Sequence, residues 1–563
     1  MENFTSKDKQ IFDDMKKCVK DTGNTTTQVN ILCISIAITG KDPLKDKITS
    51  VATCAPDHPP ILFDIIKSKP EDIITLKQLL EDHTAKVFFD AKKALNFFHA
   101  AGFEINGPIY DVMLMDKILR VGYSEKNLTI NSLITQYLGT FMTIDSAVIP
   151  VDKEAEILLK LYEVILRHLT ENDLMDTATL EFECIRAVAE MERNGIRVNG
   201  NKLKDMLREF TERQDNSVNI LRQNLGDVNL NSYKKVKEAL IKKGIMVKDT
   251  RQDTLHPHIF PNLYLFDYHI YKKFKYYRSL AAALLAKIDP STGRLYPKYS
   301  QIGAPNGRFS CSEPNLHAIP KTEEFRSCFI PDDGYKLIIA YYSQIELRIV
   351  AEISHDKRMV NAYQMGDDLH KLTASLITGK SMDSVSRDEC LIAEAVNYGL
   401  IYNMGEKDLK EFFHDNYGIT ILPQQEQKFR SVFFSTYKGI APWHEDFELQ
   451  SYDETRTLGN RRRVWHGYYI NTTDLLKTMI QGTTADILKR ALCVLHERIK
   501  NTGIKIVGCI HREIIMEAPV MEEADAAIQI IHKSMTDAGQ HYLKEVPVVV
   551  NISAVDNWHE KQG

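Results

Sequence analysis

Three short apolar runs in the second half of the chain constrain its fold more than any other feature. KLIIAYY is continuous over residues 336–342, and IKIVGCI and EIIMEA stand on either side of the pair His511 and Arg512. Continuous apolar runs of this length predict buried strands, and the two-residue gap predicts a tight hairpin. The run RDECLIAEAVNYGLIYNM (387–404) has helical spacing. We therefore expect buried strands combined with helices in this half.

The first 170 residues show a different order of patterns. Three strand-like runs, VNILCISIAI, KITSVATCA and PPILFDII, lie within residues 29–66, and the helical run EDIITLKQLLEDH follows. KVFFD predicts another buried strand, and KKALNFFHAAG predicts the helix after it. This order predicts a mixed α/β domain that ends near residue 170. From about 172 to 215 the apolar spacing is helical.

Length and composition limit the kind of protein. A chain of 563 residues has room for two to four domains, and 44% hydrophobic with 26% charged residues is ordinary for a globular protein. The net charge of −5 means that a nucleic-acid binder would need local basic surfaces. Nine cysteines without CxxC pairs predict reduced thiols, the N-terminus MENFTSKDKQ does not resemble a secretory signal, and no apolar run has membrane-spanning length. We expect a soluble intracellular protein with no membrane partner.

Two basic helical stretches lie between residues 229 and 290. They are NLNSYKKVKEALIKKG and YHIYKKFKYYRSLAAALLAKI. In the second, four cations alternate with four aromatic residues, namely Lys272, Lys273, Lys275 and Arg278 with Tyr271, Phe274, Tyr276 and Tyr277. This mixture suits a nucleic acid, because cations bind phosphates and rings stack on sugars or bases. The alternative is a solvated helix face whose aromatic residues lie in the core.

Six segments resemble, in order, motifs of the family A DNA polymerases, the group of bacterial DNA polymerase I. They are SQIGAPNGRFSCSEPNLHAIP (300–320), IIAYYSQIELR (338–348), DDLHKLTA (367–374), AVNYGLIY (395–402), IQGTTADILKRA (480–491) and CIHRE (509–513). One such match is weak, but six in the family's order are specific. The resemblance extends over roughly residues 20–560. It leaves no room for an N-terminal 5′ nuclease domain.

The resemblance implies a multidomain chain of the α/β and α+β classes. A 3′–5′ exonuclease-like domain of the ribonuclease H-like type would precede the palm, fingers and thumb of a polymerase hand. The expected limits are 1–172 for a degenerate exonuclease-like domain, 173–300 for the thumb and the beginning of the palm, 301–366 for the palm with the DYSQIELR-like motif, 367–450 for the fingers and 451–563 for the palm with the HDE-like motif.

The family's chemistry uses two Mg²⁺ ions to hold the attacking and leaving oxygens of nucleotide addition. The resemblance implies that one Asp in DYSQIELR and one in HDE hold these ions, while an Arg and a Lys on the fingers helix hold the triphosphate. All four positions differ here. Tyr341 and Arg512 stand at the metal positions, and Cys390 and Glu394 at the triphosphate positions. The formal charge changes from −2 to +1 on the metal side and from +2 to −1 on the triphosphate side.

These replacements oppose the family's chemistry. A phenol with an ordinary pKa of about 10 is a poor Mg²⁺ ligand, and a guanidinium keeps its proton and repels a divalent ion. Glu394 would repel a triphosphate. We expect Tyr341 to fill the vacated metal pocket and Arg512 to pair with a carboxylate of Glu513, Glu346 or Glu394. No catalytic residue, metal site or cofactor is then expected.

Other positions of the family are retained. The resemblance implies contacts near the primer terminus and the minor-groove side of a duplex for Gln301, Arg308, Asn315, Gln481 and His511. It implies nucleotide-site remnants at Glu346, His370, Tyr398 and Tyr402, the last two on one helix face with Cys390 and Glu394. Arg462 lies in the basic run Arg461, Arg462 and Arg463, which also resembles the family. The alternatives are a structural role in the palm and, for the basic run, a solvated loop.

The exonuclease-like domain lacks the family's four carboxylates. The nearest match to its DxE pair is DTG at residues 21–23, and the NxxxD-like site at 90–94 lacks its second carboxylate. Asp111 resembles a retained position, with a structural role as the alternative, and no YxxxD occurs between 155 and 175. A two-metal site cannot be assembled from this set, so we expect a scaffold.

Three hypotheses remain. The first is a pseudo-polymerase that binds primer–template DNA, single-stranded DNA, RNA or a replication protein. The second is an active DNA polymerase that holds Mg²⁺ with displaced carboxylates, with Glu346, Glu513 and Glu517 as candidates. The third is a structural subunit of a larger assembly. The cations of 229–290 and Arg308 favour nucleic acid, whereas the net charge and Glu394 favour weaker binding or a protein partner. The fold alone does not distinguish these three hypotheses, because function depends on the site.

Overall fold

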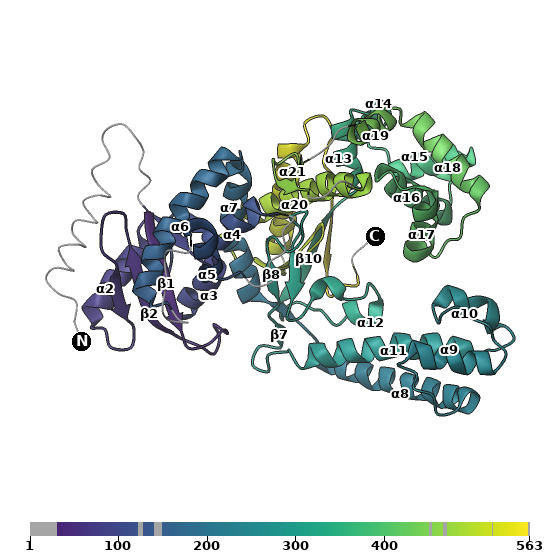
Figure 1. Ribbon diagram of the computed structural model, residues 1–563, viewed down its shortest axis with the longest axis horizontal. Helices are drawn as coiled ribbons and strands as arrows, with labels where there is room; N and C mark the ends of the chain where they lie inside the picture. Colours follow the sequence, from purple (N-terminus) through teal and green to yellow (C-terminus); the bar gives the residue numbers. More distant parts are fainter. Residues whose placement is uncertain are drawn as a thin grey trace. The chain divides into compact units, whose positions relative to one another are not determined.

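Figure 1 shows the computed structural model of the chain. The structure describes residues 31–121, 128–139, 149–449, 453–465, 470–520 and 522–560. It forms two compact units. The larger unit holds the chain up to Asn194 together with Tyr299–Ser310 and Ile338–Ser553, and the smaller holds Gly195–Lys298, Cys311–Leu337 and the segment from Ala554. Because both units are built from discontinuous segments, the domain limits drawn from the sequence stay predictions.

The N-terminal part of the larger unit is a five-stranded sheet in the order β3-β2-β1-β4-β5. Its strands are β1 (Ile31–Ile38), β2 (Ile48–Cys54), β3 (Ile61–Asp64), β4 (Ala85–Phe88) and β5 (Ile109–Asp111). The first three are antiparallel neighbours, and β4 runs parallel to β1 and β5. The predicted order of strands before alternating strand and helix is confirmed.

Helices cover this sheet. They are α2 (Pro70–Glu81), α3 (Ala91–Ala100), α4 (Val112–Leu119), α5 (Ile130–Leu133), a π-helix over Ile134–Leu138, α6 (Val151–Glu171) and α7 (Met175–Asn194). The helix α6 contacts β1 and β2. Its residues Leu158, Leu161, Ile165 and Leu169 are buried, and their spacing of three or four places them on one face.

A second sheet, in the order β13-β14-β10-β15, carries the apolar runs of the C-terminal half. Its strands are β10 (Tyr335–Tyr342), β13 (Lys505–Ile510), β14 (Glu513–Pro519) and β15 (Val550–Val555). The predicted hairpin is confirmed, since Ile510 pairs with Glu513 across a two-residue turn. His511 in this turn has a φ of 55°, the left-handed backbone that such short hairpins require.

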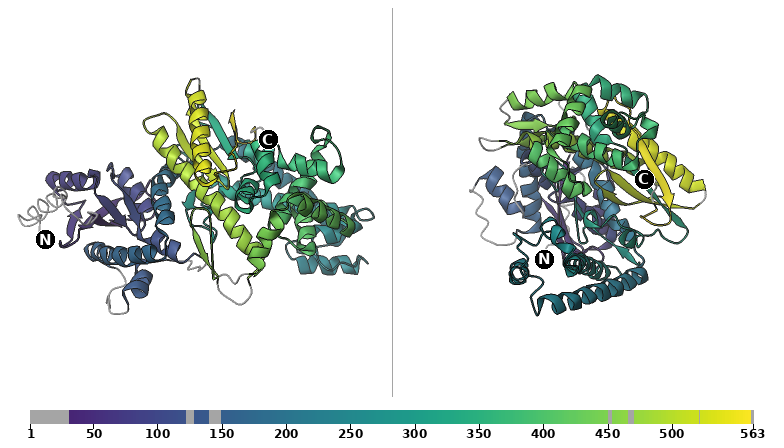
Figure 2. Two further views of the ribbon diagram at one scale, coloured as in Figure 1. Left: turned by 90° about the horizontal axis from the view of Figure 1, so that it is seen from above. Right: turned by 90° about the vertical axis from the view of Figure 1, so that its right-hand side faces the viewer.

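Three further helices of this part of the chain contact the sheet or each other. They are α13 (Ile345–Ser354), α20 (Thr472–Ile499) and α21 (Glu522–Tyr542). Helix α20 lies beside α21, yellow-green and yellow in Figure 2, and also contacts α7 and α13. The hairpin of β11 (Glu454–Arg456) and β12 (Arg462–Val464) contacts α20 through β11.

Helix α14 (Lys357–Gln364) precedes the predicted fingers segment. The α-helices of that segment are α15 (Leu369–Thr378), α16 (Arg387–Ile401), α17 (Glu406–Tyr417), α18 (Pro423–Thr436) and α19 (Ile440–Leu449). A buried polar contact joins three of these regions. The Thr373 hydroxyl lies 2.9 Å from the Asn397 side-chain oxygen and 2.7 Å from the Tyr437 hydroxyl. Thr373 is thus a structural residue.

A fully buried charge cluster joins distant parts of the larger unit. The carboxylate of Glu181 in α7 lies 2.6 Å from the guanidinium of Arg461 and is also paired with Lys489 of α20. Arg461 also pairs with Asp486 of α20 at 2.7 Å, and Lys489 donates to the Gly307 carbonyl at 2.8 Å. The charges of two positive and two negative side chains therefore compensate each other where water does not reach them. The expectation of a solvated loop is wrong for Arg461, which is 2% exposed.

The smaller unit consists mainly of four helices. They are α8 (Gly200–Leu225), α9 (Tyr233–Lys242), α10 (Gln252–Ile259) and α11 (Tyr264–Leu285). Helix α8 lies along α11, and α10 contacts α11 (Figure 1). A core that includes Leu221, Val236, Leu240, Leu255 and Tyr268 fills the space between the four helices. The short strands β6 (Ile196–Arg197) and β7 (Arg294–Leu295), β8 (Lys298–Ser300) and β9 (Ser310–Ser312), and the helix α12 (Glu323–Arg326) complete the chain.

Within the described ranges, no helix has both the length and the apolar character needed to cross a lipid bilayer.

The charge cluster gives a stability prediction. Glu181→Gln keeps the shape but leaves Arg461 and Lys489 with Asp486 as their one remaining carboxylate, so we expect a loss of roughly 3–5 kcal/mol of unfolding free energy. Denaturant unfolding measures it. Glu183→Gln is the matched control, since Glu183 is exposed on the same helix, and should change stability by less than about 0.5 kcal/mol. Equal stability of the two variants would contradict the structural importance of the cluster.

Candidate functional site

Adjacent strands bring the two residues at the predicted metal positions close together. Tyr341 lies on β10 and Arg512 in the turn before β14, which neighbours β10. The backbone N–H of Tyr342 donates to the carbonyl of Arg512 at 3.2 Å, so the two segments are joined at this point. The Tyr341 hydroxyl accepts from the Asn551 amide at 3.1 Å, and the Tyr341 side chain is half-buried.

The guanidinium of Arg512 faces the helix α16. Its Nη1 donates to the Tyr398 hydroxyl at 3.3 Å. Burial lowers the pKa of Arg512, but the contact with Tyr398 and the charges of Glu346 and Glu394 outweigh it, so that the pKa lies above its usual value. Arg512 thus keeps its proton. Within the described part of the chain its hydrogen-bond partner is a hydroxyl, so the expectation of a direct carboxylate partner is wrong, although Glu346 and Glu394 act on it through space.

Glu346 is held by another arginine. Its Oε1 lies 2.6 Å from Nη2 of Arg308, and both side chains are largely shielded, with exposed fractions of 15% and 25%. A neighbouring contact links the palm helix to the fingers, because the Gln481 amide lies 3.4 Å from the Tyr402 hydroxyl. The Gln481 side-chain oxygen accepts from Asn306 at 3.0 Å. The retained residues of this region therefore contact one another.

One face of α16 keeps the spacing of the predicted triphosphate site, but its charge is opposite to the one that the family resemblance implies. Cys390, Glu394 and Tyr398 follow one another at the spacing that places side chains on one helix face, and Tyr402 follows at the end of the helix. Burial, followed by the charge of Glu394, raises the pKa of Tyr417. Burial and the charge of Asp368 raise the pKa of the Cys390 thiol. Among these four residues Glu394 is the charged one, and its carboxylate repels a phosphate.

His370 is neutral at physiological pH. Its Nδ1 lies 3.1 Å from the amide of Asn397, and its ring lies 5.7 Å from that of Tyr398. The pKa of His370 is lowered to about 4, chiefly by burial; the charge of Asp368 opposes this shift and that of Arg512 adds to it. A neutral imidazole can donate a hydrogen bond to a phosphate but brings no charge to it.

Apart from Arg308 and Gln481, which contact Glu346 and Tyr402, the predicted nucleic-acid residues fall into two groups. Gln301 is 4% exposed and donates to the carbonyl and the carboxylate of Glu181, each at 2.9 Å, so its amide nitrogen is engaged inside the core. Arg462 donates to Asn172 at 2.6 Å and to the Leu119 carbonyl at 3.2 Å. Both therefore serve internal packing in this structure, which sequence patterns did not reveal. The other predicted contacts, Asn315, His511, Lys272, Lys273, Lys275 and Arg278, are exposed, and their contact with nucleic acid stays a prediction.

The aromatic residues between these cations lie mostly inside. Tyr271, Phe274 and Tyr277 are buried, as the alternative of a solvated helix face proposed, whereas Tyr276 is 51% exposed. Lys272 donates to the Thr250 carbonyl at 3.0 Å, and Arg278 to Gln214 at 3.2 Å. The cations of α11 thus project from a helix whose rings form its core.

In the exonuclease-like part, the matched carboxylates cap helices. Asp90 accepts from the N–H of Lys93 at 3.2 Å at the start of α3. Asp111 is buried and accepts from the N–H groups of Ala91 and Leu114, both at 2.8 Å. Burial and the charge of Asp90 raise the pKa of Asp111 to about 7. Two backbone N–H donors are what a helix cap requires, which supports the structural alternative for Asp111. The DTG match at 21–23 lies outside the described residues.

The donor set does not fit the Mg²⁺ ions of the family. A phenol and a guanidinium stand where two carboxylates are needed, and Glu346 is already paired with Arg308. Across the ranges that the structure describes, no three side chains of His, Cys, Asp or Glu gather so that they could hold a metal ion. No step through Mg²⁺ can be derived for these residues.

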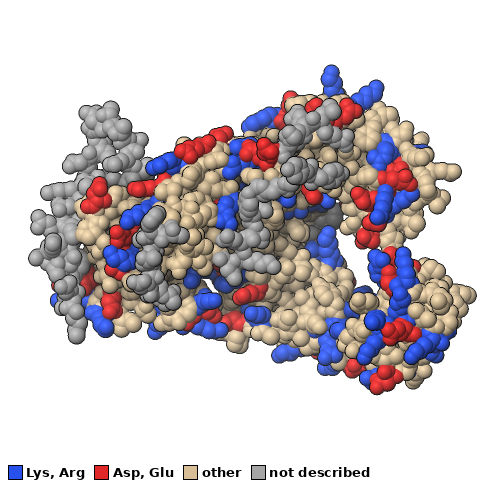
Figure 3. All heavy atoms as spheres, in the orientation of Figure 1, with Lys and Arg blue, Asp and Glu red and all other residues tan. Residues whose placement is uncertain are grey.

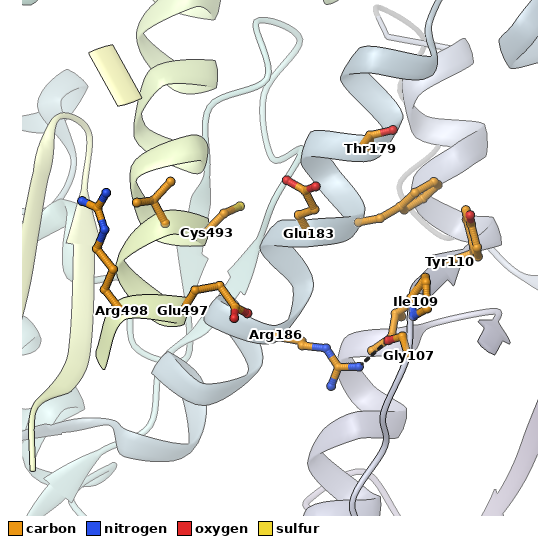
Figure 4. Close-up of a pocket in the computed structure, with 12 residues that line it drawn as sticks. Gly107, Ile109, Tyr110, Thr179, Glu183, Arg186, Cys493, Glu497 and Arg498 are labelled. Carbon is orange, nitrogen blue, oxygen red and sulfur yellow. Dashed lines mark hydrogen bonds between the residues drawn. The ribbon is translucent and has the colours of Figure 1, made fainter. Parts of the chain in front are cut away.

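A separate pocket of about 560 Å³ lies between β5, α7 and α20 (Figure 4). Three of its charged side chains have partners in the protein. Arg186 donates to the carbonyl of Gly107 at 2.8 Å, and Arg498 pairs with Asp537 at 2.6 Å. Glu497 pairs with Lys500 at 2.7 Å. The pocket shares no residue with the site around Arg512, and its walls point to no particular ligand.

Comparison with known proteins decides the family. The sequence profile of DNA polymerase family A matches residues 200–560. The chain belongs to DNA polymerase family A. It is 34% identical to DNA polymerase I of Aquifex aeolicus over 398 residues, which cover 68% of this chain and 67% of that protein. It is 29% identical to the DNA polymerase I proteins of Caldicellulosiruptor bescii and Pseudomonas aeruginosa, covering 86% of this chain in each case.

This family A chain spans 59% and 58% of the length of the latter two relatives. Its structure resembles the POL domain of Pol1 from M. smegmatis in complex with DNA primer-template and dNTP, with a TM-score of 0.85 and 24% identity. The match covers 94% of this chain and 96% of that one, which establishes the fold. The resemblance of the six motifs and the expected fold class are thereby confirmed.

The surroundings of His370 give a pH prediction. Because its pKa in the folded chain lies at about 4, below an ordinary value of about 6.5, its contribution to stability is present above pH 6.5 and is lost as the pH falls towards 4. Histidine hydrogen exchange followed by mass spectrometry measures this pKa directly. In Arg512→Gln we expect it to rise, since one nearby cation is removed. Lys371→Gln, which removes an exposed cation next to His370 in the sequence, should change this pKa less. An unaltered pKa in Arg512→Gln would place Arg512 away from His370.

Proposed function

We propose that this chain is a polymerase hand that has lost nucleotide addition and binds nucleic acid. The observation that carries the proposal is the guanidinium of Arg512, a fixed positive charge at the position where the family resemblance implies a metal-binding Asp. At about 4 Å and an effective dielectric constant of about 20, one such charge repels a divalent ion by roughly 8 kcal/mol. A site that needs two such ions cannot tolerate this cost without new carboxylates.

Two of the replaced residues and one retained pair have partners in the chain itself, which supports a settled arrangement. Arg512 contacts Tyr398, Arg308 pairs with Glu346, and Tyr341 accepts from Asn551. A site damaged at one position would leave neighbouring charges without compensation, at considerable cost. The reversed charges of Arg512 and Glu394 instead lie within each other's field. These contacts support retention of the fold for a purpose other than catalysis.

Binding of nucleic acid is supported by the cations of the smaller unit and by the relatives. Lys273 and Arg278 are exposed on α11, within a segment richer in basic than in acidic residues. The relatives carry the name DNA polymerase I, and the matched solved structure holds a DNA primer-template. The overall charge of −5 supports binding that is local and weaker than that of a broadly basic protein.

An active polymerase is the second candidate, and the names of the relatives favour it. It would need Mg²⁺ on displaced carboxylates, with Glu346, Glu513 and Glu517 as the candidates. Glu513 and Glu517 are buried on β14, and Glu346 is engaged with Arg308. These environments support the first proposal over the second.

Primer extension on a labelled primer–template tests the catalytic half of the proposal. With all four deoxynucleotides and Mg²⁺ or Mn²⁺, we expect no extension, because the donor set cannot hold the ions. Extension that disappears in a Glu346→Ala, Glu513→Ala double variant would overturn the proposal and establish displaced ligands. A DNA polymerase I protein assayed in parallel controls the substrate.

Fluorescence anisotropy over a salt series tests the binding half. We expect binding that weakens steeply with salt, as phosphate contacts require. Lys273→Gln with Arg278→Gln should lower the affinity and reduce the log–log salt slope by about 0.9 for each lost phosphate contact. The control Lys67→Gln, exposed in the larger unit, should match the parent. No binding at any salt concentration would favour a purely structural subunit.

A further inference from the structure

The exposed aromatic side chains of the described residues all lie in one stretch of the smaller unit. They are Tyr233, Phe260, Phe266 and Tyr276, with exposed fractions of 71%, 92%, 56% and 51%. The chain contains 24 Tyr, 23 Phe and 3 Trp, and the other described aromatic residues are buried or half-buried. Single exposed apolar residues are normal on a surface, but this concentration in one stretch is not scatter.

The turn from α10 to α11 forces three apolar side chains outward. Phe260 follows α10, Leu263 precedes α11 and is 71% exposed, and Phe266 lies in the first turn of α11. The N–H of Phe266 donates to the carbonyl of Leu263 at 2.9 Å, which fixes the turn. Leu265 and Tyr268 are both 1% exposed and anchor α11 to the core, so Phe266 must face away from it. We call Phe260, Leu263 and Phe266 the aromatic tip.

The segment that carries the aromatic tip is rich in positive charge, whereas residues 252–271 themselves hold two Asp and no Lys or Arg. Residues 229–290 contain twelve Lys and Arg against five Asp and Glu, in a chain whose net charge is −5. Figure 3 shows Lys and Arg gathered over the helices of the smaller unit, at the lower right. Lys273 lies seven residues after Phe266, about two helical turns along the same side of α11, and is exposed. The surface therefore complements an anionic partner that also offers flat apolar faces.

We propose that the aromatic tip binds single-stranded DNA by stacking unpaired bases on Phe260 and Phe266, while the neighbouring cations hold the phosphates. In a duplex the faces of the bases are covered by their neighbours, so exposed rings can stack only on unpaired bases. Charge complementarity selects a nucleic acid over an apolar protein surface, because the excess of positive charge in residues 229–290 would meet no opposite charge on the latter. The inference rests on the proposed function, that the chain binds nucleic acid.

Anisotropy of the full chain with two probes tests this inference. The probes are a labelled single strand of about 20 nucleotides and the same strand annealed to its complement. In the double variant Phe260→Leu, Phe266→Leu, which stays apolar but loses both ring faces, we expect single-strand affinity to fall at least about tenfold. Duplex affinity should stay within about twofold, and the salt slope should not change, because no charge is removed.

Two further variants identify the cause. Phe260→Trp with Phe266→Trp keeps the ring faces and should retain single-strand binding. Ile66→Ala, at a residue 74% exposed in the larger unit, is the control for loss of an exposed apolar side chain and should match the parent. If both the Leu and the Trp variants lose affinity, the surface recognises shape and not stacking, and the inference fails.

The remaining outcomes separate this inference from the proposed function. Unchanged single-strand binding by the Leu variant, or equal loss for both probes, overturns the aromatic tip as a site for unpaired bases and leaves nucleic-acid binding in place. Absence of binding to both probes by the parent protein overturns the proposed function itself. An RNA strand of the same sequence that binds more tightly than the DNA overturns the assignment to DNA.

Discussion

The buried cluster of Glu181, Arg461, Asp486 and Lys489 is the contact on which the larger unit depends. Glu181 and Lys489 are 308 positions apart, and neither side chain touches water. Charges removed from water are costly unless each finds close partners, so the cluster is compatible with one arrangement of α7, α20 and the β11–β12 hairpin. Gly307 lies against it with a φ of 78°, and a Cβ there would stand 2.5 Å from the Arg461 side chain. This frame fixes the strands and helices that carry the site.

The frame and the chemistry of the site are separable. The sheet β13-β14-β10-β15, the long helix α20 and the fingers helices keep the arrangement of a polymerase, although the motif resemblance implies replacement of the four residues of greatest chemical consequence. These positions are half-buried at the edge of the frame, where a side chain can exchange one partner for another at little structural cost. Arg512 with Tyr398 and Arg308 with Glu346 are such local solutions. Function depends on the site, and the same scaffold can lose one activity without losing its fold.

The sequence predicted the parts that depend on local pattern. Apolar runs located β10 and the β13–β14 hairpin, and the motif order predicted the family. The sequence did not predict features that depend on contacts between residues far apart in the chain. Arg461 belongs to a basic run that could have been a solvated loop, yet it is buried because it pairs with Glu181 of α7 and Asp486 of α20. No local sequence pattern identifies Glu181 as a partner of Arg461. Gln301 was missed for the same reason. In α11, helical spacing alone explains why Tyr271, Phe274 and Tyr277 turn inward, since residues three apart share a face.

The contact between Arg512 and Tyr398 has a consequence for small molecules in solution. In this structure a direct hydrogen bond joins α16 to the β13–β14 turn. The hydroxyl of Tyr398 is therefore held beside the guanidinium by the chain itself. Its effective concentration there is on the order of millimolar or higher, as for two groups joined by a short linker. A free nucleotide would have to displace this resident group and overcome the charge of Glu394 as well. Binding of a free nucleotide at this point would then demand contacts elsewhere in the chain.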